Sequence, residues 1–307
     1  MANRELLTAS RMTALLGCPR KHYFRYELGL VTDSPSGALR FGSAFHTAME
    51  ARWNGLPYEE ALAAALASAD RFTEIDIAIL SGLLAGYYAR YSGAWELVAS
   101  VQPEIQFGYP IERSLSFEAA GKIDGLGTLA DGRLCLIEHK TSGEDISPDS
   151  DYWMRLRFNP QIYQYVTAAR QLGYDVQTII YDVTRKPAIR QKQGETAEQF
   201  ADRLAADTQE RPEFYFARRE VAVMEDDLTQ FTEQRLNLGK MILHFRASAK
   251  RQKSPEWAWP RNCNGVTCRM CEYSGFCLAN VSVDVNQPPA GFKAGVFNPE
   301  LSATTTE

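Results

Sequence analysis

The stretches Gly121–Asp124, with the sequence GKID, and Glu138–Lys140, with the sequence EHK, decide the fold of this 307-residue chain. They flank a short turn, so a β-hairpin would bring two acids and a lysine together. Carboxylates that converge bind a hard divalent cation through oxygen, and a neighbouring lysine can hold a phosphate or polarise a water. The pattern therefore predicts a site for metal-dependent hydrolysis of a phosphodiester.

The turn between the two stretches decides whether this site can form. A two-residue loop at Asp131–Gly132 would place Asp124 opposite His139, and Glu138 would face away. A three-residue loop over residues 130–132, with the glycine in the left-handed region, would place Asp124 opposite Glu138 instead. Both loops suit the sequence, but only the second builds a metal site, and we expect it.

The strand after the turn carries Leu134, Leu136, Glu138 and Lys140 on one face, because side chains alternate along a strand. This face begins apolar and ends charged, which indicates a site at the rim of the core. Taken alone, the charges would suit an ordinary solvent-facing hairpin equally well. Cys135 points to the other face, and we expect it to be part of the core.

The composition allows a sizeable core, since 45% of the residues are hydrophobic. The 38 acids outnumber the 33 lysines and arginines, and the net charge is -5. This balance does not favour a nucleic-acid-binding protein, but it does not exclude one, because an enzyme needs only a local basic groove. No apolar run approaches the roughly 20 residues that span a bilayer, and the first residues lack the layout of a signal peptide. We therefore expect a cytoplasmic protein with reduced thiols.

The periodicity of the apolar residues predicts helices at both ends of the chain and a strand-rich centre. Pro19 marks a break in the first helical stretch, and Thr196 with Gln199 forms a capping box for another helix. The expected helices cover residues 8–30, 42–53, 58–69, 75–91, 160–172 and 226–247. The expected strands cover residues 98–111, 115–129, 134–141, 176–183 and 214–223. This order predicts an α/β fold with a central mixed sheet flanked by helices.

Two further motifs make the hairpin resemble the PD-(D/E)XK nucleases. Gly-x-x-Asp followed by Glu-x-Lys-Thr, here residues 121–124 and 138–141, is similar to the pattern of that superfamily. Gly42–His46 (GSAFH) resembles the Gly-x-x-x-His helix of its RecB-like exonuclease branch, and Gln161–Tyr165 (QIYQY) resembles its Gln-x-x-x-Tyr helix. Each motif alone is weak, but the ordered set over residues 42–165 is specific.

The resemblance implies a restriction-endonuclease-like core and a role for each motif residue. Lys140 would orient the attacking water or neutralise negative charge. Gln161 and Tyr165, which lie one helical turn apart, would line the active site and contact DNA. Mg²⁺ or Mn²⁺ would be held by the motif histidine and acids, with one more acid on the preceding strand: His46, Asp124, Glu138 and Glu104.

Four of the six cysteines lie within fifteen residues: Cys263, Cys268, Cys271 and Cys277. In a reducing compartment this clustering points to metal or cluster ligation rather than to disulfides. Four thiolates suit either tetrahedral zinc or a [4Fe–4S] cluster, so the spacing leaves both open.

Cys18 together with Cys268, Cys271 and Cys277 resembles the pattern of iron–sulfur RecB-like nucleases, which include the AddB nuclease domain and CRISPR-associated members. The resemblance implies a structural [4Fe–4S] cluster that pins the two ends of the chain around the nuclease core. Cys263 departs from the pattern. It could replace Cys18 in a local four-cysteine site that would look more like zinc, although we favour Cys18.

We expect one nuclease domain over residues 1–280, with its catalytic core at residues 42–187. The cysteine cluster would join residues 8–30 to residues 261–280. The Pro-, Asn- and Thr-rich residues 281–307 are expected to form a flexible tail.

The resemblance implies a metal-dependent deoxyribonuclease, similar to single-strand exonucleases of repair, recombination or phage systems. Its partner would be DNA, single-stranded in this interpretation. The sequence has no Gly-x-x-x-x-Gly-Lys-Ser/Thr motif, so ATP-driven unwinding would need a helicase or recombination partner. Two alternatives stay open: a catalytically silent DNA-binding or scaffold subunit, and a zinc-stabilised phosphodiesterase. Candidate contacts to the phosphate backbone are Arg20, Lys21, Arg25, Arg185 and Lys186.

Overall fold

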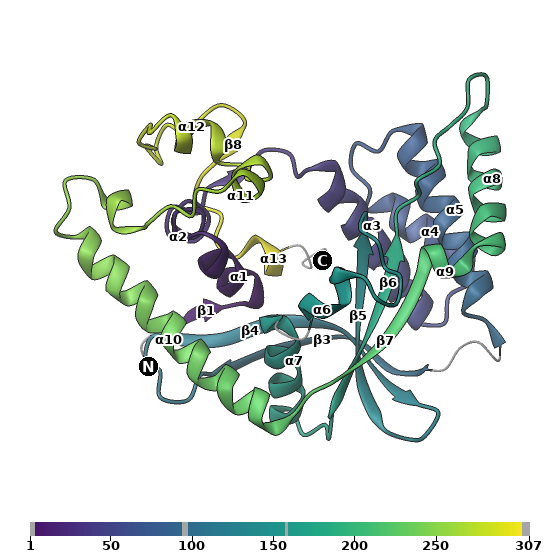
Figure 1. Ribbon diagram of the computed structural model, residues 1–307, viewed down its shortest axis with the longest axis horizontal. Coiled ribbons are helices and arrows are strands. Elements are labelled where there is room, and N and C mark those ends of the chain that lie inside the picture. The colour runs from purple at the N-terminus through teal and green to yellow at the C-terminus, as the bar shows by residue number, and fades with distance from the viewer. Residues whose placement is uncertain (1–3, 94–97, 157–158, 303–307) are drawn as a thin grey trace. The chain divides into compact units, whose positions relative to one another are not determined.

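The alternating apolar residues at the centre of the sequence form three long strands. These strands are β3 (Val98–Pro110), β4 (Phe117–Leu129) and β5 (Leu134–Ser142). The computed structural model, shown in Figure 1, describes residues 4–93, 98–156 and 159–302. Within these residues six strands form one sheet in the order β1-β4-β5-β6-β7, with β3 also paired to β4. The remaining strands of this sheet are β1 (Glu5–Leu7), β6 (Thr178–Arg185) and β7 (Phe216–Ala222).

The sheet mixes both strand directions, as the sequence predicts. Strand β5 pairs antiparallel with β4 and parallel with β6, while β7 pairs antiparallel with β6. Helices flank it, so the chain has the mixed α/β architecture of restriction-endonuclease-like folds. Among the described residues, no helix is both long enough and apolar enough to span a membrane.

The chain divides into two compact units. The central unit comprises Ser36–Gln106 and Lys122–Met224, and the terminal unit comprises Met1–Pro35, Phe107–Gly121 and Glu225–Glu307. The prediction of a single nuclease domain over residues 1–280 remains a prediction.

The central unit carries helices on its part of the sheet. Helices α4, α5 and α8 gather beside one another in Figure 1, and α3 packs against α4 and β5. The two glycines of α5 that face α8 allow a close approach: a Cβ on Gly86 would lie 2.0 Å from Oγ1 of Thr208. The helices are α3 (Gly37–Trp53), α4 (Tyr58–Ala67), α5 (Glu74–Arg90), α6 (Asp151–Leu156), α7 (Pro160–Gln171), α8 (Ala197–Glu210) and α9 (Pro212–Tyr215).

The faces of β5 meet different surroundings, because its side chains alternate. Cys135 and Ile137 are buried in an apolar cluster with residues of α3, α4 and α5, among them Phe45 and Leu83. The prediction that Cys135 belongs to the core is therefore confirmed. The alternate residues, which include Glu138, face the other side of the sheet.

The terminal unit begins with the stretch predicted as one helix over residues 8–30, and Pro19 divides it. Thr8 caps the first helix by accepting a hydrogen bond from the Arg11 amide, and Pro19 occupies the first turn of the second. A π-helical turn continues this second helix. The elements are α1 (Ala9–Gly17), α2 (Pro19–His22) and η1 (Tyr23–Glu27).

The rest of the terminal unit comes from the C-terminal part of the chain. Its long helix α10 packs against α1, and Gly239 of α10 leaves room for the ring of Phe117, which a Cβ would approach to 3.1 Å. The elements are β2 (Val31–Thr32), α10 (Glu225–Ala249), η3 (Pro255–Ala258), α11 (Gly265–Arg269), α12 (Ser274–Leu278), β8 (Phe292–Lys293) and α13 (Pro299–Ser302).

The segment after residue 281 differs from the predicted flexible tail. Strand β8 pairs antiparallel with β2, and the Glu300 carboxylate accepts hydrogen bonds from the hydroxyls of Thr8 and Tyr26. These partners lie more than 250 positions away in the sequence, so the local composition could not reveal them. Residues 303–307 of that predicted tail lie outside the described residues.

Candidate active site

The turn of the β4–β5 hairpin is the three-residue loop that the sequence predicts. The amide of Leu129 donates to the carbonyl of Arg133 at 2.9 Å, and Gly132 has a φ of 87°. The register of the two strands pairs Gly125 with Ile137 and continues to Thr128 and Leu134 without a bulge. One step further along this register, Asp124 stands opposite Glu138. The condition for a shared carboxylate site is therefore met.

Helix α3 carries His46 to these carboxylates. Its Nδ1 lies 3.4 Å from Oδ2 of Asp124. Gly42, one turn earlier, faces β5, and a Cβ there would lie in ordinary contact with Oγ1 of Thr141, at 3.6 Å. The motif glycine and histidine thus lie on the side of α3 that meets the hairpin.

A series of polar contacts links β5 to α7. The ammonium group of Lys140 pairs with the Glu138 carboxylate and donates to Oε1 of Gln161 at 3.1 Å. The amide nitrogen of Gln161 donates to the hydroxyl of Tyr165 at 3.0 Å. Pro160 and the Asn159 cap begin the helix here, so Gln161 lies in its first turn. The structure therefore joins Glu138, Lys140, Gln161 and Tyr165 in one series of contacts and places His46 against Asp124.

The two acids have opposite electrostatic behaviour. Burial acts to raise the pKa of Asp124, but the charge and hydrogen bond of His46 outweigh it and hold the pKa below its ordinary value. Burial dominates at Glu138 and raises its pKa to about 7, although the Lys140 ammonium opposes the shift. Burial acts to lower the pKa of His46, yet the Asp124 carboxylate raises it overall. Of the two acids, Glu138 is therefore the one whose charged form is destabilised by the surroundings.

One oxygen of this site has no partner among the residues that the structure describes. Oε2 of Glu138 is buried and accepts no hydrogen bond from them, and the residue is 1% exposed. A buried carboxylate is stable only with compensating donors or a cation. The donor types of Glu138, Asp124 and His46, together with this unpartnered oxygen, fit a divalent cation. Across residues 4–93, 98–156 and 159–302, however, no three His, Cys, Asp or Glu side chains are already arranged around a metal position.

Glu104 lies beside this site but is engaged elsewhere. Its carboxylate pairs with Lys122, and its backbone has an unusual φ of 45°. Burial, and then the neighbouring Glu104, raise the pKa of Glu50, which lies one helical turn beyond His46. The structure thus groups Glu104 with Glu50 and Lys122 rather than with Asp124 and Glu138.

Two tyrosines near the site have no counterpart in the sequence prediction. Tyr181 of β6 is the register partner of Glu138, is fully buried, and receives a hydrogen bond of 3.4 Å from the Asn159 side chain. Tyr152 of α6 interacts electrostatically with Lys140 and Glu138. The parallel pairing of β5 with β6 would have revealed Tyr181, but this pairing cannot be read from either strand alone.

A family model described as the PD-(D/E)XK nuclease superfamily matches residues 6–278. The chain belongs to this superfamily. It is therefore a nuclease, and members of the superfamily typically use Mg²⁺ or Mn²⁺.

Solved structures with a similar chain trace include two at low sequence identity. A crystal structure described as "Putative exonuclease" from Eubacterium rectale is 14% identical with a TM-score of 0.49, and the match covers 92% of this chain and 91% of that one. A structure described as SSO0001 is 13% identical with a TM-score of 0.34, covering 92% and 90%. Both TM-scores fall below 0.5, so neither bears on the assignment. No curated protein matches the chain.

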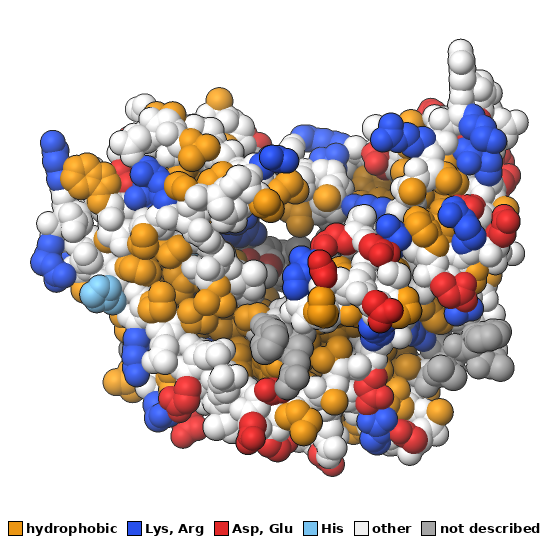
Figure 2. Space-filling view, in the orientation of Figure 1, with side chains coloured by type: hydrophobic (Ala, Val, Ile, Leu, Met, Phe, Trp, Pro, Cys, Tyr) orange, Lys and Arg blue, Asp and Glu red, His pale blue; other side chains and the backbone are white. Residues whose placement is uncertain are grey.

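Two of the predicted phosphate contacts of the nuclease, Arg20 and Lys21, already interact with other groups of the protein. Arg20 is buried and donates to the Trp259 carbonyl, so it does not face a ligand. Lys21 pairs with Glu272 at 2.9 Å. In the central unit, basic and acidic side chains alternate over α5 and α8 (Figure 2), as the net charge suggests. Because Arg20 is buried and bonded to Trp259, the prediction that it contacts phosphate is wrong. The sequence could not show this, since Trp259 lies far away along the chain.

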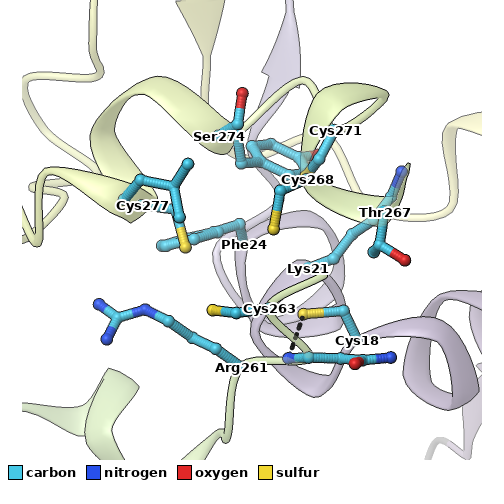
Figure 3. A pocket seen from close by; sticks show the side chains of 13 residues that line it. Cys18, Lys21, Phe24, Arg261, Cys263, Thr267, Cys268, Cys271, Ser274 and Cys277 are labelled. Atoms are coloured by element: carbon cyan, nitrogen blue, oxygen red, sulfur yellow. Dashed lines mark hydrogen bonds between the residues drawn. The ribbon is translucent and has the colours of Figure 1, made fainter. Parts of the chain in front are cut away.

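The terminal unit of the nuclease gathers five cysteines around one pocket. Four of their sulfur atoms, those of Cys18, Cys263, Cys268 and Cys277, point toward a common space in Figure 3. Cys271 also lines the pocket and interacts electrostatically with Cys18. Cys18 comes from the junction of α1 and α2, so cysteines from both ends of the sequence line this pocket.

The pocket has features that suit thiolate ligation. The backbone amide of Asn262 donates to the sulfur of Cys18 at 3.4 Å. All five thiols are free. Cys263 is exposed yet interacts electrostatically with Cys268 and Cys277. The geometry therefore keeps Cys263 beside the four predicted ligands and does not select among the five.

Proposed function

We propose that this nuclease is a metal-dependent deoxyribonuclease that degrades single-stranded DNA from an end. The observation that carries the proposal is the buried Glu138 carboxylate, which stands opposite Asp124 and whose Oε2 has no hydrogen-bond partner among the described residues. A divalent cation would give Oε2 the partner that Lys140, which pairs with Oε1, does not provide. The same observation favours an active enzyme over a catalytically silent scaffold, because a buried oxygen without a partner is unfavourable unless a ligand fills the site.

Each residue of the proposed site has a distinct task. Asp124, Glu138 and His46 would hold Mg²⁺ or Mn²⁺, which when bound lowers the pKa of a water and stabilises charge on the phosphate. Lys140 carries a positive charge, because the Glu138 carboxylate raises its pKa against the effect of burial. It would therefore orient the water or neutralise the charge that develops on phosphate oxygens. Gln161 holds the Lys140 ammonium at 3.1 Å and would keep it aimed at the scissile phosphate.

We further propose that the cysteine pocket holds a [4Fe–4S] cluster through Cys18, Cys268, Cys271 and Cys277, as in the RecB-like branch that the sequence resembles. The five free thiols around one pocket and the amide donor to the Cys18 sulfur support thiolate ligation. Tetrahedral zinc, with Cys263 in place of Cys18, is the alternative that the same pocket allows. The cluster would be structural and would fasten α1 and α2 to the C-terminal segment within the terminal unit.

The function is tested by incubating end-labelled single- and double-stranded DNA with the protein and Mg²⁺ or Mn²⁺. Wild type should shorten the single strand, and Asp124→Ala should reduce the rate at least 100-fold, since outright loss of a metal ligand exceeds the 10- to 100-fold cost of losing a supporting partner. Glu220→Gln is the matched control, because this carboxylate lies on the same sheet but pairs with Arg133 at 2.6 Å. Intact DNA under every metal would refute the enzyme, and full activity of Asp124→Ala would refute the site.

A closed circular single strand distinguishes the exonuclease from an endonuclease. An enzyme that needs an end should leave the circle intact while it degrades the linear strand of the same sequence. Cleavage of the circle at a similar rate would show that the nuclease acts internally.

A further inference from the structure

A buried polar cluster lies on the reverse face of the strand that carries Glu138 and Lys140. His139 stands between these two residues and therefore points to the opposite face of the sheet. The strand register places it beside Asp182 of β6, and Asp182 beside Arg218 of β7. His139 is 3% exposed and Asp182 2% exposed. Three adjacent strands thus contribute one polar residue each to a single buried row.

Three polar side chains converge on one oxygen of Asp182. The Nε atom of Arg218 lies 3.1 Å from Oδ2, Nδ1 of His139 lies 3.3 Å from it, and the hydroxyl of Tyr87 donates to it. Arg218 also donates to the Tyr87 hydroxyl at 2.9 Å. A buried carboxylate needs such polar and charged neighbours, because an uncompensated charge in the interior is strongly unfavourable. The contact with Asp182 therefore restrains the orientation of the His139 ring.

The same histidine touches the proposed active site from behind. Its backbone amide donates to Oδ2 of Asp124 at 2.8 Å, and this oxygen is the one that faces His46. Its ring meets the ring of His46 edge-on, with 6.3 Å between centroids, and lies 6.0 Å from Trp53 of the same helix. One residue therefore contacts an acid and the histidine of the proposed metal site.

Sheet stability alone does not require this cluster. Well-packed apolar residues often replace buried charged groups at no cost in stability, and the neighbouring positions Cys135 and Ile137 on this face are apolar. A polar row at position 139 is therefore better explained by what it holds in place. The objects in contact with it are Asp124 and His46.

We propose that His139 is a positioning residue of the nuclease, and that the contact between its Nδ1 and the Asp182 carboxylate holds Asp124 and His46 in the arrangement that binds the divalent cation. This inference rests on the metal site proposed above. Asp182, Arg218 and Tyr87 form the anchor, and His139 transmits their fixed geometry through its amide and its ring. The residue touches neither the substrate nor the cation.

Two substitutions separate hydrogen bonding from packing. His139→Phe keeps the ring volume against Trp53 and His46 but removes the Nδ1 donor. His139→Asn removes most of the ring but keeps a nitrogen donor near the position of Nδ1. Cys135→Ala is the matched control, since it opens a cavity on the same face of the same strand away from the cluster. The readouts are Mn²⁺ affinity by calorimetry without DNA, kcat and KM on single-stranded DNA, and the urea midpoint of unfolding.

The proposal expects His139→Phe to weaken Mn²⁺ binding about 10-fold, at the lower end of the 10- to 100-fold effect of groups that orient metal ligands. At subsaturating Mn²⁺ its kcat should fall about as much, with KM for DNA unchanged. His139→Asn and Cys135→Ala should keep near-wild-type Mn²⁺ affinity even where they unfold at lower urea. A role in packing alone would reverse this order, with the phenylalanine variant retaining Mn²⁺ affinity, and would overturn the inference.

The calorimetric arm distinguishes this inference from the proposed function. If wild type binds Mn²⁺ but cleaves no DNA, the nuclease proposal fails while the three variants still decide the role of His139. If wild type binds no Mn²⁺, the metal site is refuted and the inference is refuted with it.

Discussion

At the scale of single residues, His22 shows how burial can make stability depend on pH. It is fully buried in the terminal unit, where its ring stacks on Trp259 and its Nε2 accepts a hydrogen bond of 3.2 Å from Nε of Arg11. Burial, and then the positive charge of Arg11, lower the pKa of His22 to about 2. The folded protein therefore requires the neutral imidazole.

The unfolded chain protonates His22 near pH 6.5, so between pH 6.5 and 2 it binds one proton more than the folded protein. The stability from neutral His22 is complete above pH 6.5 and falls by about 1.4 kcal/mol for each pH unit below it. Urea unfolding between pH 4 and 7 should show this slope of the unfolding free energy against pH in wild type. In His22→Gln the slope should be smaller by the contribution of one proton, about 1.4 kcal/mol per pH unit. The exposed His244 provides the control His244→Gln. Equal slopes in wild type and His22→Gln would contradict the assignment.

The sequence predicts the residues of the candidate active site more readily than it predicts the residues that surround them. The motif positions Asp124, Glu138 and Lys140 follow from alternation along one hairpin, which is local information. His139 lies within that motif, but its partner Asp182 is about forty positions away on β6. Only the parallel pairing of the two strands shows that they meet. Glu104 illustrates the converse, since its motif position did not reveal that Lys122 would engage it.

At the scale of elements, the three-residue turn connects β4 to β5, and Gly132 is its most constrained residue. Its φ of 87° is unfavourable for a residue with a Cβ, although a Cβ there would meet no atom within 4 Å. Gly132→Ala should therefore lower the free energy of unfolding by about 1–2 kcal/mol through backbone strain alone. Gly143→Ala, at an equally open position without a positive φ, should cost about 1 kcal/mol less.

Urea denaturation measures both glycine variants, and a cleavage assay at low temperature measures their activity. The strand pairing from Gly125 to Thr128 is independent of the turn, so folded Gly132→Ala should keep the wild-type kcat. Equal stability of the two variants would show that the turn carries no strain. A large loss of activity in the folded variant would show that the turn rather than the strands holds the register.

Elements with strong local signals were predictable, and elements made by distant contacts were not. The capping box of Thr196 and Gln199 and the helix break at Pro19 are present as expected. Strand β8 has two residues and exists because β2 lies across from it, so no periodicity could reveal it. Helix α6 has a single short run of residues between β5 and α7, too brief for a helical period to appear.

At the scale of the whole molecule, the terminal unit consists of three separate segments of the chain. Arg11 and Arg246 each pair with both Glu5 and Glu27, which joins the first strand, the first helices and α10 in one network of charges. The sequence predicts that the two ends meet only through the cysteines. These ion pairs could not be predicted, because the sequence does not show which of its 71 charged residues pair with one another.

The cysteine pocket yields the prediction that concerns both ends of the chain. If Cys18 is a cluster ligand, protein purified without oxygen should contain iron and sulfide and show a broad visible absorption band, which zinc with its filled d shell cannot give. Cys18→Ser should lose the band and expose residues before Pro35 and after Glu225 to proteases, since structural metal sites contribute directly to folding. Cys263→Ser should keep the band, and Cys135→Ser controls for the loss of a thiol outside the pocket. The reverse result, with the band lost in Cys263→Ser and kept in Cys18→Ser, would place the metal in a local C-terminal site, and a colourless protein with stoichiometric zinc would replace the cluster altogether.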